Sequence, residues 1–112
     1  MGPAEQEDAM PTGEDAENRP LADDEIDRKL AALEGWVRSS DGRRISRRFA
    51  FKGFAPAVEM ANLAAWLGNR HNHHPDIAFG WGYCEVSFTT HDAGGLTGRD
   101  LASAAALNAL VA

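Results

Sequence analysis

The chain has 112 residues, the size of one domain, and its single cysteine, Cys84, excludes a fold that depends on internal disulfides. Of the formal net charge of −6, a charge of −5 lies in residues 1–22, where six acidic residues meet one basic residue, and the rest of the chain has eleven acidic and ten basic residues. A nearly neutral body does not attract nucleic acid. Because the sequence has no membrane-spanning apolar run and no secretory or myristoylation signal, we expect a cytoplasmic protein without membrane or nucleic-acid partners.

The N-terminal segment differs in composition from the rest of the chain. Residues 1–20 contain three prolines, two glycines and almost no large apolar side chain. Such a segment cannot bury enough surface to offset the entropy lost on ordering. We therefore predict a disordered acidic tail over 1–20 and one folded domain over 21–112, with a partner-binding arm as the alternative use of the tail.

Beyond the tail, hydrophobic periodicity predicts three helices and four strands. In chain order these are a helix over 23–33, strands over 36–38 and 44–51, a helix over 56–67, strands over 77–79 and 83–90, and a helix over 98–111. Gly68 and Asn69 are typical terminators of the second helix. Thr97 and Asp100 match a capping box at the start of the third helix.

This order, α-β-β-α-β-β-α, predicts an α+β fold. The strands form two hairpins, so the four-stranded sheet is expected to be antiparallel, with the three helices packed on one of its faces. The opposite face, which carries Tyr83, Glu85, Ser87 and Thr89, is then left to solvent or to a partner subunit. Because a thin domain gains stability by covering such a face, we predict a homodimer or homotetramer.

Four arginines gather around the second predicted strand. They are Arg43, Arg44, Arg47 and Arg48. Arg47 interrupts the apolar alternation of Ile45, Phe49 and Phe51, which leaves a bulge or a register shift open. We interpret the cluster as solvated charges that protect a sheet edge from aggregation, with a binding patch as the alternative.

The candidate chemistry lies in four histidines, which all fall between positions 71 and 91: His71, His73, His74 and His91. Imidazole is the side chain best suited to proton transfer near neutral pH. Pro75 favours an extended backbone at His74, and His91 ends the last predicted strand, so His91 can converge with the adjacent pair. Two other interpretations remain open: a histidine metal site, and surface or capping residues, which is how we interpret His71.

Several segments, in order and with matching spacing, resemble the pterin-4a-carbinolamine dehydratase family over residues 21–110. They are Leu33-Glu34-Gly35-Trp36, Phe49-Ala50-Phe51-Lys52-Gly53-Phe54, His73-His74-Pro75-Asp76, and Thr90-His91-Asp92-Ala93-Gly94-Gly95-Leu96-Thr97 with Asp100. The resemblance implies a saddle-shaped antiparallel sheet with helices on one side, assembled into dimers or tetramers.

The resemblance also implies an activity, the dehydration of a 4a-hydroxytetrahydropterin to the quinonoid dihydropterin and water, with a pterin as the substrate and neither a metal nor an organic cofactor. On this basis His73, His74 and His91 are the expected catalytic residues. Trp36, Pro75 and Asp100 are the expected substrate-binding residues.

One position departs from the family's pattern, which commonly has an acidic residue where this chain has Asn69. An acid there could orient or charge a histidine, whereas asparagine can only hydrogen-bond. The resemblance therefore carries a second hypothesis, a non-catalytic partner protein. The family includes a dimerisation cofactor of a transcription factor and a RuBisCO assembly factor of α-carboxysomes, so RuBisCO is a candidate partner.

Overall fold

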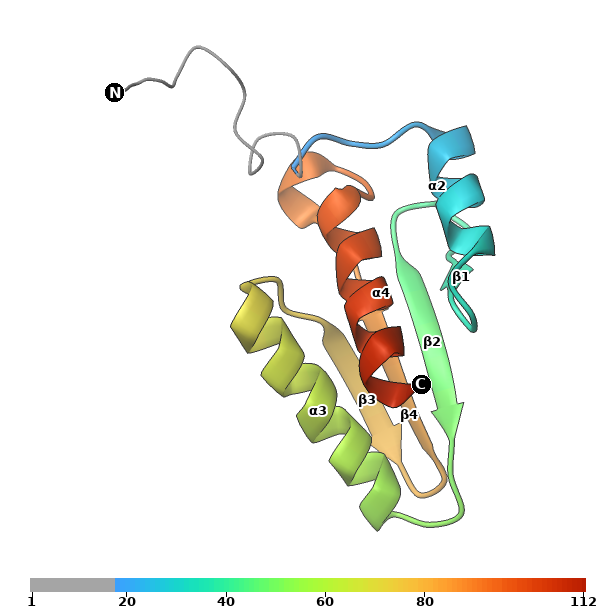
Figure 1. Cartoon of the computed structure of the whole chain (residues 1–112), viewed down its shortest axis with the longest axis vertical. Coiled ribbons are helices and arrows are strands. Elements are labelled where there is room, and N and C mark those ends of the chain that lie inside the picture. Colours follow the sequence, from blue (N-terminus) through green and yellow to red (C-terminus); the bar gives the residue numbers. More distant parts are fainter. Residues whose placement is uncertain (1–17) are drawn as a thin grey trace, which may run out of the picture.

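The computed structural model describes residues 18–112, so the predicted tail lies outside the described residues except for its last three positions. Pro20 already forms an isolated bridge with Thr97. The elements, in chain order, are α2 (Asp23–Ala31), β1 (Val37–Arg38), β2 (Ile45–Ala50), α3 (Ala55–His71), β3 (Asp76–Gly80), β4 (Tyr83–Phe88), the 3₁₀ turn η1 (His91–Ala93) and α4 (Gly98–Val111). The predicted order of helices and strands is confirmed (Figure 1).

The four strands form one antiparallel sheet with the order β1-β2-β4-β3. The last strand in the sequence therefore lies between β2 and β3. Cys84 of β4 is opposite both Phe49 and Phe79, and Val86 is opposite Ile77, so these side chains share the face that α3 and α4 cover (Figure 1).

The core forms between this sheet face and the two long helices. Its largest fully buried side chains include Ile45, Val86 and Phe88 from the sheet and Leu107 from α4. On α3 the buried positions are mostly alanines, which lets the helix backbone approach the sheet closely. The helices thus lie on one face, as the sequence predicted.

Arg47 interrupts the apolar alternation of β2, but the strand has no bulge there. The ladder between β2 and β4 is regular, and Arg47 is opposite Val86 on the helical face of the sheet. Its guanidinium lies 4.4 Å from the centre of the Phe49 ring and donates to Asn108 Oδ1 of α4 at 2.6 Å. The interpretation of all four arginines as solvated edge charges is therefore wrong for Arg47, which is half-buried beneath the end of a helix.

The second helix is longer than predicted. It continues through Gly68 and ends at His71, where Asn72 adopts the left-handed conformation (φ 53°) and caps it. Gly68 does not end the helix; it lets the following segment fold back against it, because a Cβ there would collide with Pro75 and lie 3.2 Å from the carbonyl oxygen of His73. A close approach, rather than a positive φ, accounts for this glycine.

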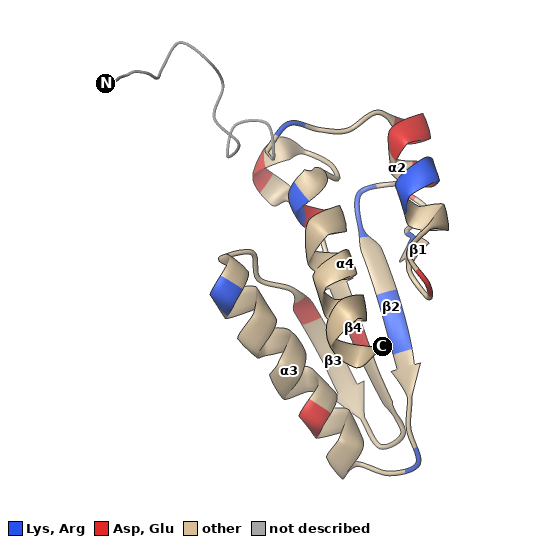
Figure 2. Cartoon of the chain, viewed as in Figure 1, with Lys and Arg blue, Asp and Glu red and all other residues tan. Residues whose placement is uncertain are grey.

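The opposite face of the sheet is polar, and its charges are paired within the chain. Arg48 lies 3.4 Å from Glu85 and over the Tyr83 ring, and Arg44 lies 2.7 Å from Asp76. Figure 2 shows basic residues just before and within β2 and acidic residues within β3 and β4. Within residues 18–112, no helix is both long and apolar enough to cross a membrane.

Candidate active site

Three of the four histidines surround one open hollow at the edge of the sheet. His73 and His74 lie between α3 and β3, and His91 follows β4. The start of β3 is paired with the end of β4, where Asp76 is opposite Ser87, so the antiparallel ladder brings the two histidine segments together. The hollow has a volume of about 290 Å³ and is lined by Asn72, His73, His74, Thr89, Thr90, His91, Asp92 and Arg99; we call it the histidine hollow.

His73 is the most constrained of the three. Its side chain is 9% exposed, and its Nε2 lies 2.6 Å from Oδ1 of the fully buried Asp100. The other carboxylate oxygen of Asp100 accepts from the Thr90 hydroxyl at 2.8 Å and from the Thr97 backbone N–H at 2.9 Å. The second of these bonds is half of the predicted capping box, which is confirmed. The carboxylate that caps α4 therefore also anchors an imidazole.

This anchoring decides which nitrogen of His73 is available. An ionised carboxylate only accepts hydrogen bonds, so Nε2 carries the hydrogen that Asp100 receives. When the ring is neutral, the lone pair is then on Nδ1, which has no hydrogen-bond partner among residues 18–112. The Phe88 ring stacks on the imidazole with a centroid distance of 5.8 Å and an interplanar angle of 16°. His73 is thus a fixed imidazole that presents one unprotonated nitrogen.

His74 and His91 are both exposed and less constrained. His74 Nε2 lies 3.5 Å from the side-chain oxygen of Asn69, at the limit of a hydrogen bond. Asn69 lies in the last turn of α3, so the residue at which this chain departs from the expected pattern does face a site histidine. His71, the last residue of α3, is exposed and does not line the histidine hollow.

The three expected substrate-binding residues do not line the histidine hollow. Trp36 is 5% exposed in the core, where its Nε1 donates to Asn108 at 2.8 Å and its ring packs 5.8 Å from Phe88. Asp100 is completely buried, and Pro75 packs on Gly68. The role of these three residues in substrate binding stays a prediction. Trp36 supports Phe88, which in turn stacks on His73. Asp100 contacts two residues that line the hollow, His73 and Thr90.

Five of the eight lining residues were not among the site residues predicted from the sequence: Asn72, Thr89, Thr90, Asp92 and Arg99. Thr90, the last residue of the strand predicted over 83–90, donates to Asp100 and so joins this carboxylate to the site. Arg99 donates to the Asn72 backbone oxygen and, at 3.2 Å, to the Asn18 side chain, so it holds the cap of α3 against the start of α4. Its position next to Asp100 was the signal that could have revealed it.

Other ionisable groups do not enlarge the site. Burial raises the pKa of the Cys84 thiol, and Cys84 lies on the helical face of the sheet, away from the histidine hollow. Among the described residues, His, Cys, Asp and Glu side chains form no group of three that could hold a metal ion. The three imidazoles that line the histidine hollow are side chains suited to proton transfer near neutral pH.

Fold and site together define a class, a small α+β protein with clustered, carboxylate-anchored histidines at the edge of an antiparallel sheet. The family described as pterin 4 alpha carbinolamine dehydratase matches residues 19–110. The chain belongs to this family.

Similar proteins agree with this membership. A relative from Paracoccus denitrificans (strain Pd 1222), named "Putative pterin-4-alpha-carbinolamine dehydratase", is 49% identical over 89 residues, which are 80% of this chain and 83% of the relative. A relative of the same name from Nitrosospira multiformis is 37% identical over 91 residues, 81% of this chain and 79% of the relative.

Two solved structures share the fold. The crystal structure of a transcriptional coactivator/pterin dehydratase from Brucella melitensis has a TM-score of 0.76 at 30% identity and covers 84% of this chain and 100% of that one. A pterin dehydratase-like protein identified as a RuBisCO assembly factor in the α-carboxysome has a TM-score of 0.56 at 26% identity, over 69% of this chain and 89% of that one. The second of these structures is thus described by assembly rather than by catalysis.

Proposed function

We propose that this protein dehydrates 4a-hydroxytetrahydropterins to quinonoid dihydropterins. The observation that carries the proposal is the histidine hollow, where His73, His74 and His91 border one open space and a buried carboxylate fixes the first of them. Family membership supplies the substrate class.

The reaction needs one proton removed and one proton delivered. A base takes the proton from N5 of the pterin, the C4a–O bond breaks, and the hydroxyl leaves as water after receiving a proton. The electron pair of the N5–H bond forms the N5=C4a double bond, so the pterin changes neither its redox state nor its total charge. Two imidazoles on the same space can do both transfers. His73, with its lone pair on Nδ1, is suited to act as the base or to hold the substrate, while the exposed His74 and His91 are free to exchange protons with water.

An alanine series tests this proposal. The decay of a chemically generated 4a-hydroxytetrahydropterin is followed by absorbance, with wild-type protein and with His73→Ala, His74→Ala and His91→Ala. Each variant should lose roughly 10²-fold or more in kcat/KM, the scale of a lost general acid or base. His71→Ala is the matched control, because His71 is exposed and lies outside the histidine hollow; it should change kcat/KM by less than about threefold.

Asn69 allows a second test of the same site. An acid at this position would lie near His74 Nε2, where its charge would favour the imidazolium. Asn69→Asp should therefore raise the activity or leave it unchanged. A large loss of activity in Asn69→Asp would contradict the proposed role of His74 in proton transfer.

The second candidate function is that of an assembly factor. Two observations favour it: the structural similarity to a RuBisCO assembly factor, and the uncharged Asn69 beside His74. The discriminating measurement is the same decay assay run beside sedimentation of the protein with purified RuBisCO. A wild-type protein that leaves the decay rate unchanged but sediments with RuBisCO would exclude the enzyme and support the assembly factor.

A further inference from the structure

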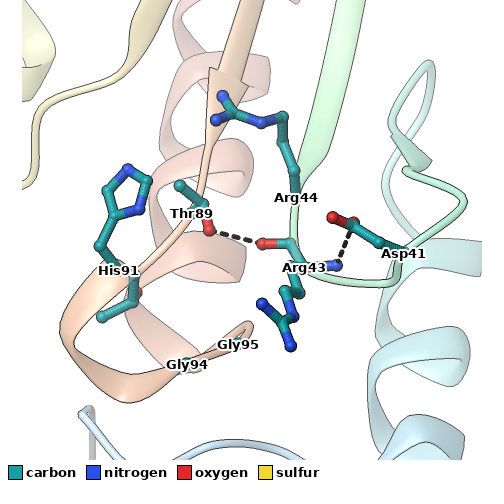
Figure 3. A pocket seen from close by; sticks show the side chains of 8 residues that line it. Asp41, Arg43, Arg44, Thr89, His91, Gly94 and Gly95 are labelled. Carbon is teal, nitrogen blue, oxygen red and sulfur yellow. Dashed lines mark hydrogen bonds between the residues drawn. The ribbon is translucent and has the colours of Figure 1, made fainter.

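A second hollow adjoins the histidine hollow on the other side of His91. It has a volume of about 220 Å³ and is lined by Asp41, Arg43, Arg44, Thr89, Thr90, His91, Gly94 and Gly95 (Figure 3); we call it the arginine hollow. The two hollows share Thr89, Thr90 and His91. His91 is therefore the wall between them, and a molecule bound beside it can extend into both.

Among residues 18–112, the charges that line the arginine hollow leave one cation, Arg43, without an ion pair. Arg44 forms an ion pair with Asp76, with 2.7 Å between Nη1 and Oδ2. Asp41 accepts from the Ser39 hydroxyl at 2.6 Å and from the backbone N–H of Arg43 at 3.0 Å, and these two bonds hold the pKa of its carboxyl below its usual value. The guanidinium of Arg43 is exposed and forms no ion pair among residues 18–112.

The geometry directs this cation into the hollow. In Figure 3 the Arg43 guanidinium extends toward the Gly94–Gly95 loop, whereas Arg44 extends in the opposite direction. The loop leaves the space open, because a Cβ at Gly94 or at Gly95 would meet no atom within 4 Å. Arg43 is held at its backbone, where its carbonyl oxygen accepts from Thr89, so its position relative to His91 is defined by the fold.

The chemistry of the proposed substrate points to what this space would accept. The reacting atoms of the pterin are C4a and N5, and N5 is bonded directly to C6, which carries the side chain that distinguishes natural pterins. When N5 lies among the histidines, a C6 side chain therefore starts next to them. The shared wall at His91 gives that side chain a direct path into the arginine hollow.

We propose that the arginine hollow is the subsite for the C6 side chain of the pterin and that Arg43 selects side chains that end in an anionic group, a phosphate ester or a carboxylate. This inference rests on the proposed dehydratase function and specifies its substrate class. A guanidinium matches either anion with two parallel hydrogen bonds, so phosphate and carboxylate are separate arms of the test.

The test compares three 4a-hydroxytetrahydropterins in the decay assay. One has a methyl group at C6, one has a C6 side chain that ends in a phosphate ester, and one has a side chain that ends in a carboxylate. For wild-type protein, kcat/KM should be about 5- to 20-fold higher for at least one anionic substrate than for the methyl substrate, the scale of an exposed charge-assisted hydrogen bond. Arg43→Gln should bring this ratio close to one by raising KM for the anionic substrate with little change in kcat, because the contact is made equally in the ground state and the transition state.

Arg48→Gln is the matched control. It removes the same charge from the opposite face of the sheet, where Arg48 pairs with Glu85, and it should leave the ratio at its wild-type value. The wild-type ratio should also fall as salt is added, because the Arg43 contact is exposed to solvent. Equal kcat/KM for all three substrates, or a preference that survives Arg43→Gln, would refute the subsite while the dehydratase function stands.

A binding measurement keeps the inference testable if wild-type protein accelerates none of the three decays, which would refute the proposed function. The probe is a stable 7,8-dihydropterin with a phosphate-ended C6 side chain, titrated by its fluorescence. Binding that weakens about tenfold in Arg43→Gln but not in Arg48→Gln would retain the subsite. Equal binding by wild type and Arg43→Gln would overturn it.

Discussion

Asp100→Asn is the most informative perturbation of this protein, because Asp100 is shared between the helix cap and the candidate site. The substitution keeps the size of the side chain and replaces one carboxylate oxygen by an amide NH₂. The Thr97 backbone N–H can only donate, so the amide oxygen must stay opposite Thr97 and Thr90. The NH₂ group is then left facing His73 Nε2. Since two donors cannot face each other, we expect the His73 hydrogen to move from Nε2 to Nδ1.

Both the activity and the stability should respond, by different amounts. The tautomer change removes the lone pair from Nδ1 of His73, so kcat/KM should fall roughly 10²-fold or more. The hydrogen bonds from Thr90 and from the Thr97 backbone N–H change from a charged to a neutral acceptor. Each change lowers the free energy of unfolding by about 1 kcal/mol, or about 2 kcal/mol in total. For a domain of this size that loss corresponds to a decrease in Tm of about 8–16 °C. The variant should therefore be folded at 25 °C but nearly inactive.

Three measurements separate these effects: the pterin decay assay, a thermal melt, and the ¹⁵N chemical shifts of the His73 ring, which report the tautomer. Asp24→Asn is the control, because Asp24 is exposed on α2 and its carboxylate accepts only from the adjacent Glu25 N–H among the described residues. It should change the free energy of unfolding by no more than about 1 kcal/mol and leave kcat/KM unchanged. A folded Asp100→Asn variant that keeps activity within threefold of wild type would refute the argument that Asp100 positions a functional His73.

Other predictions follow from packing, burial and the tail. Gly68→Ala should lower Tm by more than about 5 °C, because the new methyl group would meet Pro75, whereas Gly98→Ala, whose Cβ would meet no atom within 4 Å, should not. Because burial raises the thiol pKa, Cys84 should stay protonated in the folded protein at pH 8 and react with a thiol reagent only after denaturant is added; rapid reaction with the native protein would contradict its burial. A chain that begins at Leu21 should melt within a few degrees of the full chain and sediment as the same dimer or tetramer, and a monomer at micromolar concentration would contradict the predicted oligomer. Dialysis against a chelator should leave the pterin decay rate unchanged, and a loss that zinc restores would show that the site needs a metal.

The sequence by itself determined the order of the helices and strands, and for most of the sheet it determined which face is buried. Alternation at Cys84, Val86 and Phe88 identifies one buried face, because side chains on a strand alternate with period two. The capping box at Thr97 and Asp100 depends on residues three positions apart, so local pattern was sufficient for it. The histidine segments and their spacing indicated the family whose model matches residues 19–110.

Only the tertiary structure decided how distant segments meet. The position of β4 between β2 and β3 depends on the long-range pairing of β2 with β4, which no local pattern encodes, and this pairing is what brings Arg43 beside His91 in the arginine hollow. The second role of Asp100 depends on a contact across 27 positions of sequence. From the sequence, capping of α4 was a sufficient reason for a carboxylate at Asp100. A carboxylate has two oxygens, however, and in the fold the second oxygen of Asp100 anchors the imidazole of His73.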